Sequence, residues 1–348
     1  MDEPVAEDKT AAPAVSVVIV AYNCADTLTA CLEHLAAQSF SDFETIIVDN
    51  ASPQGEAQAA AARFPFVRLV EAGANLGFAG GVNLGARRAR GRWMALLNPD
   101  AFPRPDWIAA LLDAARTRPD FRVFTSRQLM ADDPRVLDGL GDVMSGPCIP
   151  YRGGYMNPDP GDTRLGEVFS PCGGAMMIER QLFLDIGGLD EDFFCYCEDV
   201  DLGYRLQLIG EGALIVPDAV VRHVGSASSG GPKSEFAVFH GARNRFWVLV
   251  KNTPAALLPI VLPLHVLAVG FIATRREGRK QAAVTWRALK AAVKDLPKIL
   301  RTRRRVQAMR KVSSLTLARA MTWNPNDLRG RRPVIRPLRP RPTRPGEP

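Results

Sequence analysis

The stretch that decides the fold is Val15-Ser16-Val17-Val18-Ile19-Val20-Ala21, near the start of a chain of 348 residues. A nearly continuous β-branched run of this kind is typical of a strand buried on both faces in a parallel sheet. The turn Tyr22-Asn23-Cys24-Ala25-Asp26 follows, and then a helix with apolar residues on one side. Further buried strands are expected over residues 43–48 and 67–70, with an Ala-rich helix between them. This β-α-β-α-β opening predicts a doubly wound α/β fold.

Polar residues follow the predicted strands. In doubly wound folds, ligands bind beyond the carboxyl ends of the strands. Tyr22 and Asn23 follow the first strand, and Asp49 follows the second. Trp93-Met94-Ala95-Leu96-Leu97 predicts another buried strand, which ends in Asn98-Pro99-Asp100. A carboxylate at such a strand end can hold a divalent cation, although a simple Asp turn has the same sequence.

A glycine-rich stretch lies between these strands, Asn75-Leu76-Gly77-Phe78-Ala79-Gly80-Gly81-Val82-Asn83. Glycines let the backbone approach a ligand closely, and Asn side chains both donate and accept hydrogen bonds. The alternative is a helix start with flexible glycines. The first turn has no G-x-G-x-x-G, which disfavours a dinucleotide site, and the chain has no G-x-x-x-x-G-K-[ST], which excludes a P-loop.

The acidic stretch Cys195-Tyr196-Cys197-Glu198-Asp199-Val200-Asp201 places three carboxylates in four positions at the start of a predicted helix. The partial positive charge of a helix N-terminus favours acidic residues, so an ordinary helix start is the alternative. The other strand-end turns and the lone His223, which follows a β-branched run, favour a functional site. Residues 139–166, rich in Gly, Pro, Asp and Arg, are expected to form a long functional loop.

These pieces together, in this order, resemble an inverting glycosyltransferase of family 2 with the GT-A fold. The resemblance covers about residues 14–252 and points to the rhamnosyltransferase-like branch. The matching pieces are Val20-Ala21-Tyr22-Asn23, Val48-Asp49-Asn50-Ala51-Ser52, Asn75 to Asn83, Asn98-Pro99-Asp100, Glu198-Asp199-Val200-Asp201-Leu202, His223 and Arg243-Asn244-Arg245. We therefore expect a Rossmann-like, mostly parallel sheet flanked by helices.

The resemblance implies a nucleotide-diphosphate sugar as donor, with dTDP-rhamnose as the best specific choice. UDP- or GDP-sugars, and a catalytically silent nucleotide-sugar-binding scaffold, are the alternatives. Asp100 and His223 would hold Mg²⁺ or Mn²⁺. Many family members carry D-x-D where this chain has Asn98-Pro99-Asp100, so an amide replaces one of the two carboxylates at this turn. The residues implied to bind the donor are Tyr22, Asn23, Asp49, Asn75, Gly77, Asn83, Asn98 and Arg243.

The resemblance also implies that Asp199 is the general base. It would take the proton of an acceptor hydroxyl as that oxygen attacks the anomeric carbon, opposite the leaving diphosphate. Glu198 would raise the proton affinity of Asp199 or orient the acceptor. The acceptor would be a saccharide of the cell envelope, linked to a lipid.

The charge of the chain is divided unevenly. Residues 1–274 hold 22 Lys and Arg against 33 Asp and Glu, whereas residues 275–348 hold 22 against 4. Residues 252–274 lack charge, but their internal prolines argue against a simple spanning helix. Residues 281–300 predict one basic amphipathic helix, with Trp286, Leu289, Val293, Leu296 and Leu300 in a stripe. A helix packed on the catalytic domain is the alternative.

The expected organisation follows from these segments. Residues 1–13 form a disordered tail, 14–252 the GT-A domain, 253–323 a helical membrane-associating region, and 324–348 a disordered Arg/Pro-rich tail. The N-terminus lacks the basic and apolar regions of a signal peptide. We expect a cytoplasmic protein attached to the inner face of the cell membrane through its anionic surface, with no nucleic acid as partner, because the basic stretch adjoins an apolar one.

Overall fold

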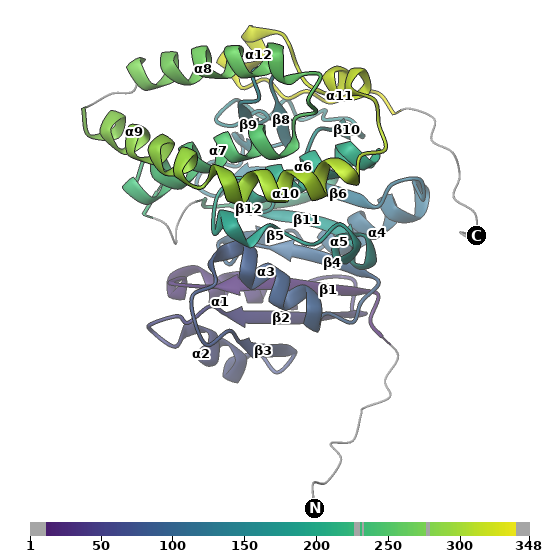
Figure 1. The fold of residues 1–348 in the computed structure, drawn as a ribbon. Coiled ribbons are helices and arrows are strands. Elements are labelled where there is room, and N and C mark those ends of the chain that lie inside the picture. The colour runs from purple at the N-terminus through teal and green to yellow at the C-terminus, as the bar shows by residue number, and fades with distance from the viewer. Residues whose placement is uncertain (1–11, 226–229, 232, 276–278, 339–348) are drawn as a thin grey trace, which may run out of the picture.

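The computed structural model of the protein describes residues 12–225, 230–231, 233–275 and 279–338. One large mixed sheet runs through the molecule and helices cover it (Figure 1). The strands are β1 (Val15–Ala21), β2 (Phe43–Asp49), β3 (Val67–Glu71), β4 (Trp93–Leu97), β5 (Ala101–Pro103), β6 (Val123–Met130), β7 (Leu137–Gly139), β8 (Asp142–Met144), β9 (Pro150–Arg152), β10 (Gly166–Val168), β11 (Ala175–Glu179) and β12 (Ala213–His223). The α-helices are α1 (Ala25–Ala36), α2 (Glu56–Arg63), α3 (Gly77–Arg88), α4 (Trp107–Thr117), α5 (Arg180–Asp185), α6 (Glu198–Ile209), α7 (Glu235–Asn252), α8 (Leu258–Arg275), α9 (Arg279–Lys294), α10 (Leu296–Ala308), α11 (Ser314–Ala320) and α12 (Pro325–Gly330).

The N-terminal half of the sheet is parallel, as predicted. Strand β1 lies between β2 and β4 and pairs with both in parallel, and all seven of its residues are buried. Strand β3 continues the parallel set beside β2. Because parallel strands end at the same edge, the turns after β1, β2 and β4 come together there. This edge is where the sequence predicted the ligand.

The other half of the sheet is mixed. The strand order is β10-β12-β6-β11-β4-β1-β2-β3, with β11 antiparallel to both β4 and β6, and β12 parallel to β6. The β-branched run before His223 is part of strand β12, whose register against β6 shifts between Val216 and Val220 around Pro217. Proline has no N–H to donate to a strand ladder, which accounts for this irregularity.

Residues 139–166 are not the long loop that the sequence predicted. They contain the two-stranded β8–β9 hairpin, and the preceding β6 is a fully paired strand of the large sheet. The sequence signal of β6 was weak because it buries polar side chains, Thr125, Ser126 and Gln128, among its apolar ones. A hydrophobic pattern cannot find a strand whose buried face is partly polar.

The C-terminal helices share a core with the catalytic domain. Side chains of α6, α7, α10 and α11 pack in one buried cluster that includes Tyr204, Trp247, Ile299 and Leu317. The expected single helix over 281–300 is two helices, α9 and α10, that break at Asp295 just before Pro297. Proline is tolerated in a first helical turn but not in a helix interior.

The expected disorder of residues 324–348 is wrong for residues 324–338. These residues form α12 and then a segment whose Arg336 exchanges two backbone hydrogen bonds with Glu167, next to β10. Ile335 packs on the core beneath the sheet. Backbone pairing and apolar burial hold the segment despite its Arg/Pro-rich composition. Residues 1–11 and 339–348 lie outside the described residues, so the remaining expectation on the two tails is untested.

Candidate active site

A cavity of about 720 Å³ opens at the carboxyl edge of the parallel strands. One wall comes from the strand-end turns of the N-terminal half together with the end of β12, and we call it the donor wall. The opposite wall comes from the β8–β9 hairpin, the loop before α6, the start of α6, and α7, and we call it the acceptor wall. Eight residues implied by the resemblance line the cavity: Tyr22, Asn75, Gly77, Asn98, Asp100, Glu198, Asp199 and His223.

The donor wall is held together by a side-chain amide. Asn50 follows β2, and its Nδ2 donates to Asn75 Oδ1 at 3.0 Å and to the Gly77 carbonyl at 3.1 Å. Its Oδ1 accepts from the Leu76 N–H at 2.9 Å. Gly77 has a φ of +70°, and an added Cβ would lie 2.4 Å from the Phe194 carbonyl oxygen. Glycine is therefore required at this turn, which brings the backbone to the edge of the cavity.

The turn after β4 brings Asp100 against His223. Asp100 Oδ1 lies 3.2 Å from His223 Nε2, and Asn98 Nδ2 lies 3.2 Å from the same nitrogen. On the other side of the ring, Nδ1 bonds Asp138 Oδ2 at 2.8 Å, and Arg152 holds Asp138 in turn at 2.6 Å. A carboxylate that orients the far nitrogen of an imidazole in this way is common behind metal-binding histidines. Asp100 and His223 therefore fit a divalent cation.

His223 and the charged groups around it change one another's pKa values. Burial would lower the pKa of His223, but Asp100 and Asp138 outweigh it and raise that pKa to about 9. Burial would likewise raise the pKa of Asp138, but Arg152 and His223 lower it to about 2. This raised pKa favours the protonated imidazole beside the two carboxylates, and Arg152 adds a second positive charge next to Asp138.

The acceptor wall carries the acidic pair. Asp199 Oδ2 accepts from the Gly173 N–H at 3.0 Å, and its Oδ1 from the Val200 N–H at 2.8 Å. These two bonds fix the carboxylate at the start of α6. Glu198 is buried, and its Oε2 has no hydrogen-bond partner among the described residues. Burial, and then Asp199, raise the pKa of Glu198 well above its usual range.

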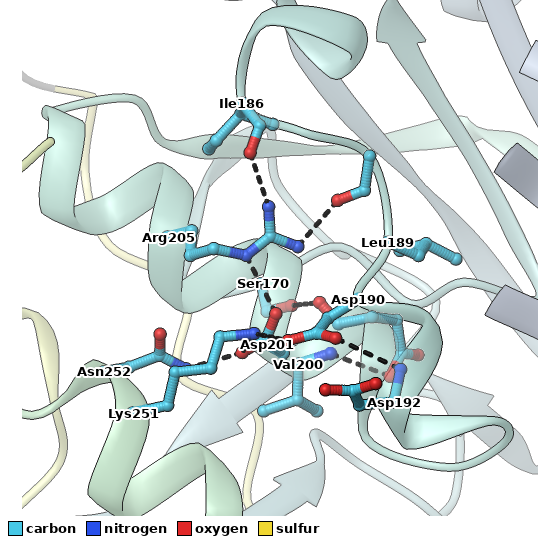
Figure 2. A network of polar contacts seen from close by, with 12 residues as sticks. Ser170, Ile186, Leu189, Asp190, Asp192, Val200, Asp201, Arg205, Lys251 and Asn252 are labelled. Carbon is cyan, nitrogen blue, oxygen red and sulfur yellow. Dashed lines mark hydrogen bonds and ion pairs between the residues drawn. The ribbon is translucent and has the colours of Figure 1, made fainter. Parts of the chain in front are cut away.

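The third carboxylate of the acidic stretch has a structural role. Figure 2 shows Asp201 at the centre of a buried network, with Lys251 Nζ at 2.7 Å, Arg205 Nε at 2.8 Å and Asn252 Nδ2 at 2.8 Å. Lys251 also reaches Asp190 at 2.5 Å. Burial would raise the pKa of Asp201, but Lys251 and Arg205 outweigh it and lower that pKa. The network ties the first turn of α6 to α7 and so fixes where Glu198 and Asp199 lie.

A strained loop leads into this helix. Phe194, Tyr196 and Cys197 all have positive φ, between 65° and 71°, which costs free energy for residues other than glycine. Asn244 of α7 compensates, because its Nδ2 lies within 3.0 Å of the carbonyls of Phe193, Cys195 and Tyr196. Helix α7 therefore holds the acceptor wall in place.

Four residues that the resemblance implied for donor binding do not line the cavity. Asn23 is exposed on the turn after β1. Asp49 accepts from the Ser52 N–H at 3.0 Å and from Gln58 at 2.9 Å. Asn83 is bonded through both ends of its amide to the Leu189 backbone. Arg243 stacks on Trp247 and donates to the Phe193 carbonyl at 3.1 Å. For the last two, internal hydrogen bonds take up the groups that a donor would need.

The sequence did not single out several residues that line the cavity. Asp142 of β8 is buried, and one of its carboxylate oxygens lies within 4.8 Å of one from Asp199 and of Cys172 Sγ. Burial, and then Asp199, raise the pKa of Asp142 well above its usual range. Arg152 and Arg245 also line the cavity. The matched piece Arg243-Asn244-Arg245 contains two arginines, and the sequence does not show which of them faces the cavity. The packing of α7 places Arg245 there.

Comparison with known proteins agrees with this architecture. The family model described as "Glycosyl transferase family 2" matches residues 16–187. An N-acetylglucosaminyl-diphospho-decaprenol L-rhamnosyltransferase of Mycobacterium tuberculosis is 32% identical over 255 residues, covering 64% of this chain and 80% of the relative. The hexosyltransferase Agl10 of low-salt glycan biosynthesis in Haloferax volcanii is 26% identical over 244 residues, covering 67% of this chain and 74% of the relative.

Among solved structures, one of GalNAc-T7 with UDP, GalNAc and Mn²⁺ matches with a TM-score of 0.55 at 16% identity. It covers 69% of this chain, and the chain spans about half (48%) of that protein. The likeness confirms the expected fold, a mostly parallel sheet flanked by helices, here with a helical C-terminal region. The chain therefore belongs to glycosyl transferase family 2, as a GT-A glycosyltransferase of the rhamnosyltransferase-like branch.

Proposed function

We propose that the protein transfers a sugar, with inversion, from a nucleotide-diphosphate donor to a hydroxyl of a lipid-linked saccharide, and that the sugar is rhamnose from dTDP-rhamnose. The observation that carries the proposal is a single cavity with Asp100 and His223 on the donor wall and Asp199 on the acceptor wall. The rhamnosyltransferase relative supports the choice of sugar, and its acceptor supports a diphospho-lipid.

The proposed chemistry is one displacement. The acceptor hydroxyl oxygen forms a bond to the anomeric carbon, the bond from that carbon to the diphosphate oxygen breaks, and the hydroxyl proton passes to Asp199. The backbone N–H groups of Gly173 and Val200 hold the Asp199 carboxylate in place, while its remaining lone pairs accept the proton. Attack opposite the leaving group inverts the configuration.

The donor wall would bind the nucleotide and its diphosphate. Tyr22 and the Asn75–Gly77 turn would line the nucleoside, and Asn98 the diphosphate. Asp100 and His223 would hold a divalent cation, which would neutralise the negative charge that develops on the leaving diphosphate. His223 would have to give up its proton to bind the cation, and Asp138 would keep the other ring nitrogen protonated.

The donor proposal is tested by titrating dTDP, UDP and GDP into the purified protein with Mn²⁺ or Mg²⁺, for the wild type and Asp100→Ala. We expect metal-dependent preference for dTDP that the variant loses. A preference for UDP or GDP would replace the donor but keep the mechanism. If none of the three binds, the scaffold alternative takes precedence over the enzyme.

We also propose that the protein binds the membrane surface through α8 and α9. The described part of the chain contains no helix with both the length and the hydropathy needed to cross a bilayer. Helix α8 nevertheless exposes a row of apolar side chains, and Leu267 is 69% exposed. On α9, Ala288 and Ala292 are buried, whereas Trp286 and Val293 of the predicted apolar stripe are 63% and 58% exposed. The basic side chains beside it would contact anionic headgroups.

Membrane attachment is tested by co-sedimentation with vesicles of phosphatidylglycerol and phosphatidylcholine. The wild type should pellet with the vesicles, and Leu267→Glu combined with Phe271→Glu should remain in the supernatant. Phe66→Glu, which changes an exposed apolar residue just before β3, serves as the control. Equal sedimentation of the double variant and the wild type would contradict the proposal.

A further inference from the structure

Arg245 is a half-buried cation that no carboxylate of the described residues balances. It lies on α7 and lines the cavity. Its Nε is buried without a hydrogen-bond partner, and no carboxylate of the described residues pairs with it. Arg243, two residues earlier, is instead hydrogen-bonded to backbone and stacked on Trp247. The two arginines thus have opposite environments on one helix.

The neighbours of Arg245 make its charge costly. The groups that act on it most are the thiols of Cys197 and Cys148 and the guanidinium of Arg331. Burial raises the pKa of both thiols far above neutrality, so neither carries a negative charge there. Burial also lowers the pKa of Arg245 itself. A guanidinium whose Nε is buried without a partner and that lacks a counter-charge is costly to a fold, so the position is explained if a ligand in the cavity supplies the anion.

The position of Arg245 favours an acceptor rather than a donor as the source of that anion. Its neighbour Cys197 directly precedes Glu198 and Asp199, and Cys148 lies in the turn between β8 and β9. Both belong to the acceptor wall, whereas Asp100 and His223 belong to the donor wall. Helix α7 also packs against α9, which carries the exposed Trp286 and Val293. Arg245 therefore lies on the helix that connects the acceptor wall to the proposed membrane-binding helix.

We propose that Arg245 binds a phosphate of the acceptor, so that the enzyme selects sugars that are linked to a lipid through a phosphate or diphosphate. The planar fork of a guanidinium matches phosphate oxygens with paired hydrogen bonds. This inference rests on the proposed function for the identity of the acceptor. The presence of an anion site at Arg245 is independent of the proposed function, and a binding experiment tests it.

The binding test uses decyl diphosphate as the probe, added by calorimetric titration to protein saturated with dTDP and Mn²⁺ so that the donor wall is filled. We expect Arg245→Gln to weaken decyl diphosphate binding at least tenfold and Arg245→Lys to weaken it less. The dTDP dissociation constant should stay within twofold of the wild type in both variants. Arg116→Gln, at an exposed arginine of α4, is the matched control. Unchanged decyl diphosphate binding in Arg245→Gln, or weaker dTDP binding, would overturn the inference.

The transfer test compares two acceptors that carry the same sugar, a decyl diphosphate-linked N-acetylglucosamine and octyl N-acetylglucosaminide. Arg245→Gln should raise KM at least tenfold for the first and less than twofold for the second. An equal rise for both acceptors would mean that Arg245 only shapes the cavity. If the wild type binds decyl diphosphate through Arg245 but transfers to neither acceptor, the proposed function fails while the phosphate site stands.

Discussion

The donor and acceptor walls line one cavity, but they differ in whether their buried polar groups have hydrogen-bond partners. On the donor wall, the side-chain amide of Asn50 is satisfied at both ends by the Asn75–Gly77 turn. On the acceptor wall, Glu198 Oε2 and Arg245 Nε are buried without partners in the described part of the chain. Unpaired buried polar groups are costly. The comparison supports the proposal that the acceptor wall carries the general base and selects the acceptor.

The largest effect is expected from Asp199→Asn. The amide cannot take a proton, so kcat should fall by about a thousandfold, within the range for loss of a general base. Binding of dTDP to the donor wall should not change. Steady-state transfer and nucleotide titration measure the two quantities, with Asp218→Asn on the exposed part of β12 as the control. Near wild-type transfer by Asp199→Asn would remove Asp199 from the mechanism.

Lys251→Met should have the next largest effect, and on stability. It leaves Asp190 and Asp201 without their shared cation, and breaking a buried ion pair in this way costs about 3 kcal/mol. The free energy of unfolding from urea titration should fall by that amount, whereas exposed Lys311→Met should leave it unchanged. A loss below about 1 kcal/mol would show that the network does not hold the acceptor wall.

Asn50→Ala probes the donor wall in the same way. Loss of the three bonds to the Asn75–Gly77 turn should cost about 1–2 kcal/mol and weaken dTDP binding about tenfold. The kcat at saturating donor should change less than twofold, because Asp199 is untouched. Calorimetric titration and saturation kinetics separate these quantities. A fall in kcat with unchanged dTDP affinity would contradict the division into two walls.

The smallest expected effect is on the pH dependence of the free energy of unfolding. His265 of α8 bonds the Pro147 carbonyl through Nδ1 at 2.8 Å, near Arg245, and its Nε2 has no partner among the described residues. Burial, with Arg245, lowers its pKa to about 4. Because the unfolded chain takes up this proton first, stability should decline as pH falls from about 6.5 to 4.

The contribution of His265 should be about 1 kcal/mol, well below the full linkage value for such a shift. It is measured as the difference between wild type and His265→Asn in urea titrations at pH 7 and pH 4.5. The variant should lose less stability over this interval than the wild type does. Equal losses would show that His265 does not titrate with unfolding.

The sequence alone determined the parallel half of the fold and most of the donor wall. The β-branched run of β1 and the polar turns after β1, β2 and β4 are local signals, and parallel strands place such turns on one edge. The resemblance supplied the pairing of Asp100 with His223, and the structure places Asp100 Oδ1 3.2 Å from His223 Nε2. The resemblance to the family, carried by the order of its matching motifs, pointed to Glu198 and Asp199 as site residues.

The tertiary structure decided the acceptor wall. Asp142 comes from a segment without a hydrophobic pattern, and Asp201 differs from Asp199 only in which side of the helix meets Lys251 and Arg205. Arg243 and Arg245 are alike in the sequence, yet the packing of α7 stacks Arg243 on Trp247 and places Arg245 in the lining of the cavity. Local patterns show which residues are polar, but whether a polar group is paired or left for a ligand depends on neighbours far away in the chain.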